Sequence, residues 1–213
     1  MFLIIDWLFQ QYAGVETHLI ILEIIGTIFG LLSVLFSKRD NILVFPTGII
    51  STSIFVYILY VYGLLGDMLI NAYYFIMSIV GWYVWTRKVE DNKFLPITKL
   101  TTRNDYLSCV AIFISTLIFI SLVYIYFAKW NSWIAYVDTF TTAIFFLGMW
   151  LMAKKKLENW IFWIIGDVIS VPLYLVKGLI FSSFQYLVFT IIAIYGYKAW
   201  KKHINKPKAT LLE

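Results

Sequence analysis

Four residues around position 167 carry the side chains best suited to binding a flat, polar or cationic molecule. Trp160, Trp163, Asp167 and Tyr174 follow one another at i, i+3, i+7 and i+14, a spacing that places three or four of them on one face of an α-helix. Indole rings beside a carboxylate favour a planar ligand through stacking and cation–π attraction, worth about 0.5–2 kcal/mol each. The sequence therefore predicts a binding stripe here. For Trp160, which follows closely after the basic loop of three lysines at 154–156, an aromatic belt at a membrane surface is the competing interpretation.

The composition predicts that this stripe lies within a membrane. Hydrophobic residues fill 62% of the 213 positions and charged residues only 14%, against roughly 45–50% and 25% in soluble domains. This excludes a water-soluble fold and predicts an all-α protein that crosses the membrane several times. The segment 1–18 is interrupted by Asp6 and is too short to cross, so we expect it to lie at the membrane surface. Charge-poor blocks predict seven transmembrane helices, over residues 19–36, 42–62, 67–86, 106–127, 134–152, 159–176 and 180–197.

Lysine and arginine are distributed unevenly between the two sides that these spans define. Fifteen of the 17 fall in the segments 37–41, 87–105, 153–158 and 198–213, and only Lys129 and Lys177 fall on the other side. Because cationic loops stay in the cytoplasm, we expect the N-terminus outside and the C-terminus in the cytoplasm. The net charge of +5 is then accounted for by topology and by contacts with anionic membrane lipid, and no nucleic-acid partner is expected.

The sequence also contains an internal repeat. Shifted by 115 positions, residues 23–85 align with residues 138–200 without a gap, and the most telling matches are Glu23 with Asp138, Gly63 with Gly178, Gly81 with Gly196, and Trp85 with Trp200. Four crossings separate the two starts, which predicts a parallel 3+1+3 repeat. Its parts are a three-helix bundle over 19–86, a linker with the fourth span over 87–133, a second bundle over 134–200 and a tail over 201–213. Transporters commonly rock two such bundles about a site near the midplane; a duplication that affects packing only is the alternative.

Acidic residues inside the spans call for a function or a partner, because a charge at the centre of a transmembrane helix costs about 2.5–3.5 kcal/mol. Asp167 lies eight residues into a span of eighteen, so we expect it to face a cavity and to contact the substrate. Glu23, Asp67 and Asp138 lie near the predicted outer ends of their spans. They are expected either to form an outer gate or to be solvated at the interface.

Amides and hydroxyls occur at comparable depth in both units. Asn71 and Tyr74 belong to the third span, and Gln185 and Tyr186 to the seventh. We expect these four side chains to bind the polar groups of a substrate. Hydrogen bonding between helices is the competing explanation.

Several chemistries have no residues to support them. The sequence contains no G-x-x-x-x-G-K-[ST] loop for ATP and no mid-membrane lysine for a retinal Schiff base. Cys109 is the single cysteine, and His18 and His203 lie on opposite sides, so no metal and no cofactor are expected. Asp167 has no evident acid–base mate, which argues against an enzyme. A receptor is disfavoured because no sizeable domain lies outside the predicted spans.

Two stretches of the sequence resemble the PnuC family of nicotinamide riboside transporters. One runs from Gly66-Asp67-Met68-Leu69 to Gly81-Trp82-Tyr83-Val84-Trp85. The other runs from Trp150-Leu151-Met152-Ala153-Lys154-Lys155-Lys156-Leu157-Glu158-Asn159-Trp160 through Asp167 and Pro172-Leu173-Tyr174 to Lys177-Gly178-Leu179. The resemblance extends from about Leu19 to Trp200. It implies a 3+1+3 bundle similar to SWEET sugar transporters, a homotrimer in the bacterial inner membrane, and import by facilitated diffusion. It further implies that a separate cytoplasmic kinase traps the product.

The resemblance also implies a set of pocket residues, namely Trp160, Trp163, Asp167, Tyr174 and Tyr186. The chain departs from the family pattern at two positions near this pocket, where Asn71 and Met149 stand in place of glutamine. Both changes alter hydrogen bonding, so a second flat cationic vitamin, thiamine, stays open as the substrate. The sequence thus predicts an importer of nicotinamide riboside, with thiamine as the alternative.

Overall fold

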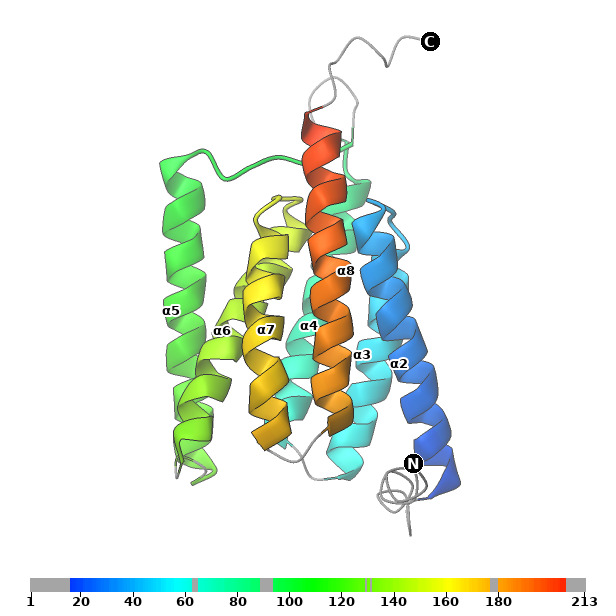
Figure 1. Ribbon diagram of the computed structural model, residues 1–213, viewed down its shortest axis with the longest axis vertical. Coiled ribbons are helices and arrows are strands. Elements are labelled where there is room, and N and C mark those ends of the chain that lie inside the picture. Colours follow the sequence, from blue (N-terminus) through cyan, green and yellow to red (C-terminus); the bar gives the residue numbers. More distant parts are fainter. Residues whose placement is uncertain are drawn as a thin grey trace.

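The structure, a computed structural model, describes residues 16–62, 65–88, 94–128, 130, 132–176 and 180–205. Within these residues seven α-helices run side by side along the long axis of the molecule (Figure 1). The expected surface segment 1–18 lies almost entirely outside the described residues. The helices are α2 (Thr17–Lys38), α3 (Val44–Val61), α4 (Leu65–Thr86), α5 (Arg103–Tyr126), α6 (Trp133–Ala153), α7 (Asn159–Val176) and α8 (Ile180–Ile204).

Each predicted span coincides with one of these helices. Six of them, α2 to α7, are long and apolar enough to cross a membrane. Helix α8 falls outside that set of described helices and runs seven residues beyond the predicted span, to Ile204. Its last turns carry Lys198, Lys201 and Lys202, which favour a helical C-terminus because cations interact well with its partial negative charge.

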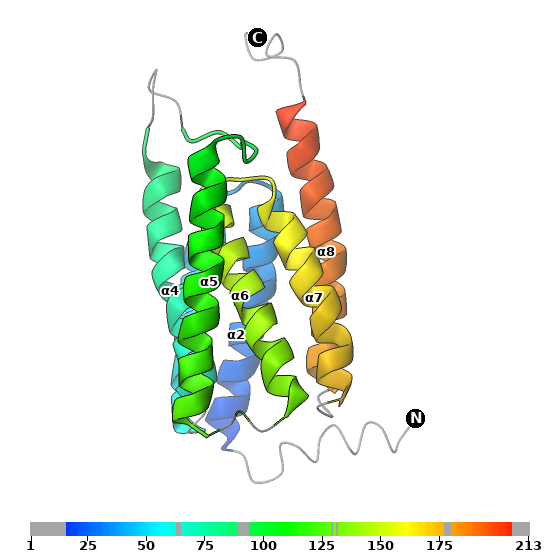
Figure 2. The same cartoon turned by 90° about the vertical axis from the view of Figure 1, so that its left-hand side faces the viewer.

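The helices pack as two neighbouring groups of three. In the first group α3 packs against both α2 and α4, and in the second α7 packs against both α6 and α8. The groups meet along two seams, where α4 packs against α6 and α2 against α8. Helix α5 packs on α6 and stands at the edge of the bundle (Figures 1 and 2). The six helices other than α5 therefore enclose the centre of the molecule.

Close packing inside each group depends on a large ring lying against a glycine. Phe45, fully buried in α3, lies against Gly81, where an added Cβ would come within 2.6 Å of the ring atom Cζ. Trp160 in α7 lies in the same way against Gly196, with an added Cβ 2.6 Å from Cη2. Because real Cβ atoms do not approach so closely, only glycine leaves room for each ring. Both partners of the second pair follow those of the first by 115 positions.

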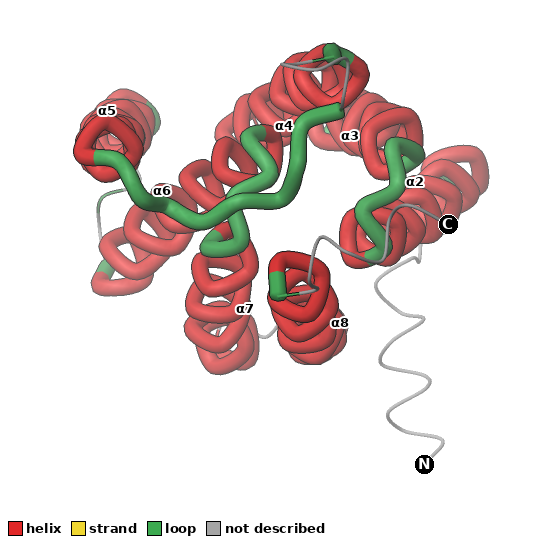
Figure 3. Tube along the Cα trace, turned by 90° about the horizontal axis from the view of Figure 1, so that it is seen from above, coloured by secondary structure: helices red, strands yellow, loops and turns green. Residues whose placement is uncertain are grey.

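An ion pair joins the two groups at the end of the molecule seen in Figure 3. The Lys155 ammonium lies 2.8 Å from a carboxylate oxygen of Asp40 and 4.1 Å from the centroid of the Trp85 ring. Asp40 and Lys155 each follow a helix C-terminus with a positive φ, 52° and 51°, which lets their amides bond back to the last turn of that helix. The ion pair thus links the turn after α2 to the turn after α6.

The segment before α5 lies across the turn between α6 and α7. Thr98 exchanges main-chain hydrogen bonds with this turn, accepting from the amide of Leu157 at 2.8 Å and donating to the carbonyl of Lys155 at 3.0 Å. Lys156 adds an ion pair to Asp105 at 3.1 Å. These contacts fix the α6–α7 turn, and with it the first residues of α7.

Candidate functional site

A cavity of about 270 Å³ lies between the two groups of helices. Its wall is formed by residues of α2, α3 and α4 on one side and of α6, α7 and α8 on the other, and no residue of α5 contributes. A volume of this size is close to that of pockets that bind small molecules. The cavity is therefore the candidate site.

Seven of the eight residues expected to bind substrate line this cavity: Asn71, Tyr74, Trp160, Trp163, Asp167, Gln185 and Tyr186. The eighth, Tyr174, is not among the lining residues. Its ring lies 4.9 Å from that of Tyr186, centroid to centroid. Tyr174 therefore contacts a lining residue without lining the cavity itself.

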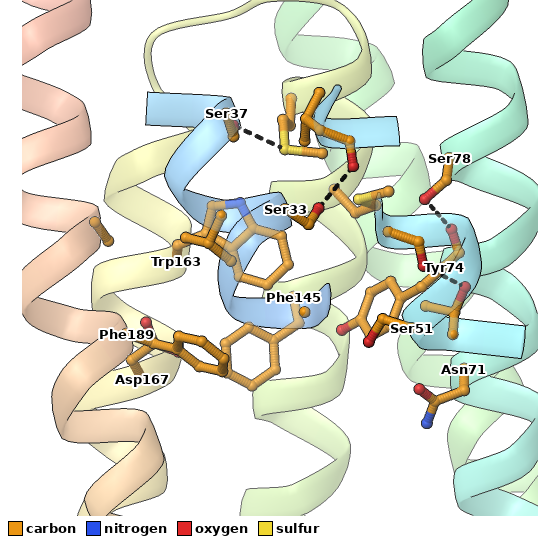
Figure 4. Close-up of a pocket in the computed structure, with 18 of the residues that line it drawn as sticks. Ser33, Ser37, Ser51, Asn71, Tyr74, Ser78, Phe145, Trp163, Asp167 and Phe189 are labelled. Carbon is orange, nitrogen blue, oxygen red and sulfur yellow. Dashed lines mark hydrogen bonds between the residues drawn. The ribbon is translucent and has the colours of Figure 1, made fainter. Parts of the chain in front are cut away.

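Aromatic rings form a continuous surface along one part of the cavity. The indole of Trp163 lies 6.3 Å from the ring of Tyr74 and 5.5 Å from that of Phe145. Phe145 lies 5.9 Å from Tyr186, whose ring in turn lies 6.5 Å from that of Phe189. These centroid distances are within the range of favourable aromatic pairs. Figure 4 shows the labelled rings turned toward the same space. A flat ligand would be stacked here.

Asp167 is buried, with 2% of its surface exposed. Its carboxylate forms no ion pair and no hydrogen bond with another described residue. Among the described lining residues it is the single aspartate, glutamate, lysine, arginine or histidine. A buried carboxylate without a counter-charge is costly, and a cationic ligand beside it would offset that cost.

Trp160 supplies a further polar group. It is 2% exposed, and its indole Nε1 has no hydrogen-bond partner in the described structure. A buried donor without an acceptor costs about 1–3 kcal/mol. Trp160 combines a packing role against Gly196 with a free donor near the cavity, so it is not simply part of an aromatic belt at the membrane surface.

Hydroxyl groups on the opposite wall were not predicted from the sequence. Ser33, Ser51, Thr52 and Ser78 line the cavity from α2, α3 and α4, and Figure 4 places Ser78 and Asn71 across the cavity from Asp167. Serine and threonine are common in membrane helices and give no periodic signal of their own. The sequence does contain one indication of this wall, because the internal alignment at a shift of 115 residues pairs Thr52 with Asp167.

Of the three residues expected to form an outer gate, Glu23 and Asp138 are not among the residues that line the cavity. Asp138 accepts a hydrogen bond from the hydroxyl of Tyr124 at 3.0 Å, which joins α6 to α5. Glu23 does not line the cavity, and the side chain of Asp67 lies outside the described part of the chain. A gating role for the three acids stays a prediction. No group of His, Cys, Asp and Glu among the described residues could hold a metal ion.

The sequence of the whole helical bundle matches one family of known proteins. The model of the family described as nicotinamide mononucleotide transporter matches residues 20–202. The chain belongs to this family. It is therefore a membrane transporter, as the resemblance in the sequence predicted.

Individual relatives agree with this assignment. The nicotinamide riboside transporter PnuC of Escherichia coli K12 is 26% identical to this chain, with 84% of each protein covered. The riboflavin/roseoflavin transporter RibM of Streptomyces davaonensis is 22% identical, with 98% of each covered. Among solved structures, the crystal structure of the vitamin B3 transporter PnuC superimposes with a TM-score of 0.64 at 22% identity, covering 86% of this chain and 81% of that one. This likeness establishes that the two proteins share a fold.

Proposed function

We propose that this chain imports nicotinamide riboside and that the central cavity is its binding site. The observation that carries the proposal is the combination of aromatic rings clustered around Trp163 with Asp167, the single acid among the described lining residues. Nicotinamide riboside presents a flat pyridinium ring with a positive charge, which suits both features through stacking and charge attraction. Nicotinamide riboside transporters of Escherichia coli and Neisseria mucosa are among the relatives.

The cavity favours the nucleoside over the nucleotide named in the family description. A phosphate group is bound in proteins by arginine, lysine or clustered amide donors. The described lining residues include no lysine, arginine or histidine, and they do include Asp167. A phosphate would thus enter beside a carboxylate without a compensating cation, so we expect nicotinamide mononucleotide to be rejected.

Two other vitamins are the rival substrates. Thiamine is also flat and cationic and would satisfy the rings and Asp167 equally well. Riboflavin is suggested by the relative that transports it, which matches this chain over 98% of its length. Riboflavin carries no positive charge and would leave Asp167 without a counter-ion, so it fits the site less well than nicotinamide riboside.

For the mechanism we propose alternating access between two three-helix units, α2–α4 and α6–α8, in the 3+1+3 arrangement of SWEET transporters, with α5 as linker. Support comes from ring–glycine contacts at matching positions in both units and from a cavity between the units. Rocking the units would separate Asp40 from Lys155. The basic loops favour an orientation with this end in the cytoplasm of a bacterium. Facilitated diffusion, trapping by a kinase and a homotrimeric assembly belong to the same proposal.

The test is uptake into liposomes that contain the purified protein. Radiolabelled nicotinamide riboside should equilibrate across the membrane without a pH gradient or ATP. Excess unlabelled nicotinamide riboside should compete, and nicotinamide mononucleotide should not. Preferential uptake of thiamine or riboflavin would replace the proposed substrate, and uptake that requires a pH gradient would contradict facilitated diffusion.

A further inference from the structure

The α2–α4 side of the cavity presents hydroxyl groups that already donate their protons to main-chain carbonyls. Ser33 donates its proton to a main-chain carbonyl of α3 at 2.7 Å, and Ser51 donates to one of α2 at 2.8 Å. Thr52 and Ser78 each donate to a carbonyl one turn earlier in their own helix, at 2.8 Å. A carbonyl oxygen accepts and cannot donate, so the direction of each bond is fixed.

A hydroxyl that has given its proton away retains lone pairs as acceptors. These four hydroxyls therefore present acceptor oxygens to a ligand, since their own protons are bonded within the protein. Such a surface is complementary to a ligand that carries O–H or N–H donors, and it repels an anion. Among flat vitamins, those with a sugar or sugar-alcohol group present two or more neighbouring hydroxyls.

Two glycines keep these oxygens within reach of the cavity. An added Cβ at Gly48 would lie 3.1 Å from the hydroxyl oxygen of Ser33 and 3.2 Å from that of Ser78, and one at Gly30 would lie 3.0 Å from that of Ser51. Both glycines line the cavity themselves. Any larger residue would cover the oxygens with carbon.

We propose that this wall, formed by Ser33, Ser51, Ser78 and the glycines Gly30 and Gly48, recognises the ribose hydroxyls of the substrate. The aromatic rings and Asp167 on the α6–α8 side then bind the positively charged pyridinium ring. The inference rests on the proposed transport of nicotinamide riboside. It also separates this substrate from thiamine, which carries a single aliphatic hydroxyl and lacks the neighbouring hydroxyls of a ribose.

The experiment is a binding cycle between side chains of the wall and hydroxyls of the ligand. Affinities of the purified protein are measured by titration calorimetry for nicotinamide riboside and for its 2′-deoxy and 3′-deoxy analogues. One lost hydrogen bond should weaken binding about 2- to 13-fold, so at least one analogue should bind that much less tightly to the wild-type protein.

Ser78→Ala is the decisive variant, because Ser78 bonds only within its own helix and its removal breaks no contact between helices. The penalty for the deoxy analogue should fall to nearly 1-fold in this variant. Ser53→Ala is the matched control, since Ser53 bonds within α3 at 2.7 Å and is exposed outside the cavity. The control should retain the wild-type penalty.

Gly48→Ala provides a second test that leaves every hydroxyl in place. The new methyl should weaken nicotinamide riboside binding by about tenfold, more than it weakens the deoxy analogue, as expected when buried polar groups lose access to their partners. Ser53→Ala serves again as the control, because Ser53 is exposed and does not line the cavity.

The outcomes separate the two proposals. If the wild-type protein binds nicotinamide riboside and the deoxy penalties are unchanged in Ser78→Ala and Gly48→Ala, the acceptor wall is wrong and the proposed substrate stands. If the wild-type protein does not bind nicotinamide riboside at all, the proposed function itself fails.

Discussion

Position 48 in α3 is glycine and position 163 in α7 is tryptophan, although the two residues occupy corresponding places in the aligned segments. The same contrast recurs at Gly30 and Phe145. Both glycines keep hydroxyl oxygens accessible, and both aromatic residues project rings into the cavity. The two walls of one cavity thus carry opposite chemistry on matching positions.

Where a ring packs against a neighbouring helix within each group, the corresponding positions have the same role. Phe45 and Trp160 each lie against a glycine, and each ring meets a tryptophan edge-on, with interplanar angles of 88° and 90°. These packing positions resemble one another because in both groups of helices a large ring must fit against the backbone of a neighbouring helix. We propose that Gly48 differs from Trp163, and Gly30 from Phe145, because the two ends of an asymmetric substrate need different partners.

The largest effect should come from removing the acid of the α6–α8 wall. Asp167→Asn keeps the size of the side chain and removes the counter-charge for the pyridinium. Truncating one partner of a buried charge pair costs about 2–5 kcal/mol, so uptake of nicotinamide riboside into liposomes should fall by about 30-fold or more. Glu16→Gln makes the same chemical change at an exposed site and should retain uptake. Equal uptake by Asp167→Asn and wild type would remove Asp167 from the site.

A smaller effect is expected where the two groups of helices are alike. Gly81→Ala and Gly196→Ala each force a methyl against a buried ring, and such overpacking costs about 1–3 kcal/mol. Thermal unfolding in detergent should shift downward for both variants by similar amounts. Gly148→Ala is the control, since its added Cβ makes ordinary contacts at 3.4 Å or more. A loss confined to one variant would mean that the two packing sites are not equivalent.

Next in size is the ion pair that links the groups. Lys155→Met leaves Asp40 without its cation. Because the Asp40 side chain is 27% exposed, water reduces the cost from the several kcal/mol of a fully buried pair to about 1–2 kcal/mol. Thermal unfolding should register this loss, and Asp40→Asn together with Lys155→Met should recover part of it. Lys154→Met, at an exposed neighbouring lysine, should have little effect. If the double variant is as unstable as the sum of the single ones, the pair contributes no coupling.

The smallest effect is expected at the seam between α4 and α6. The Tyr73 hydroxyl donates to the carbonyl of Phe146 at 3.0 Å while the two rings stack at 3.7 Å. Tyr73→Phe removes the hydrogen bond and keeps the stacking, so the unfolding free energy should fall by about 0.5–1.5 kcal/mol. Tyr126→Phe, at an 83% exposed tyrosine, is the control. A change larger than about 3 kcal/mol would mean that the hydroxyl does more than hold the seam.

The sequence predicted the helices well because the membrane requires long apolar blocks and charges mark their ends. It also predicted one wall of the cavity, since tryptophan, tyrosine and an intramembrane aspartate are conspicuous residues at helical spacing. The opposite wall could not be predicted from such signals. Serine and glycine acquire their role at Ser33 and Gly48 only through contacts between α2, α3 and α4.

Tyr174 shows a limit of helical spacing. Its spacing places it on the stripe of Asp167, and its ring packs against Tyr186 without lining the cavity, so its role in binding stays a prediction. Helical periodicity gives the direction of a side chain and not the depth at which a cavity ends.

A structure of the protein with nicotinamide riboside bound would show whether the two walls hold different ends of one substrate. We expect the pyridinium ring beside Trp163 and Asp167, and the ribose hydroxyls within hydrogen-bond distance of Ser33, Ser51 or Ser78. A ribose against the aromatic rings with the pyridinium against the serines, or a ligand outside this cavity, would contradict this expectation.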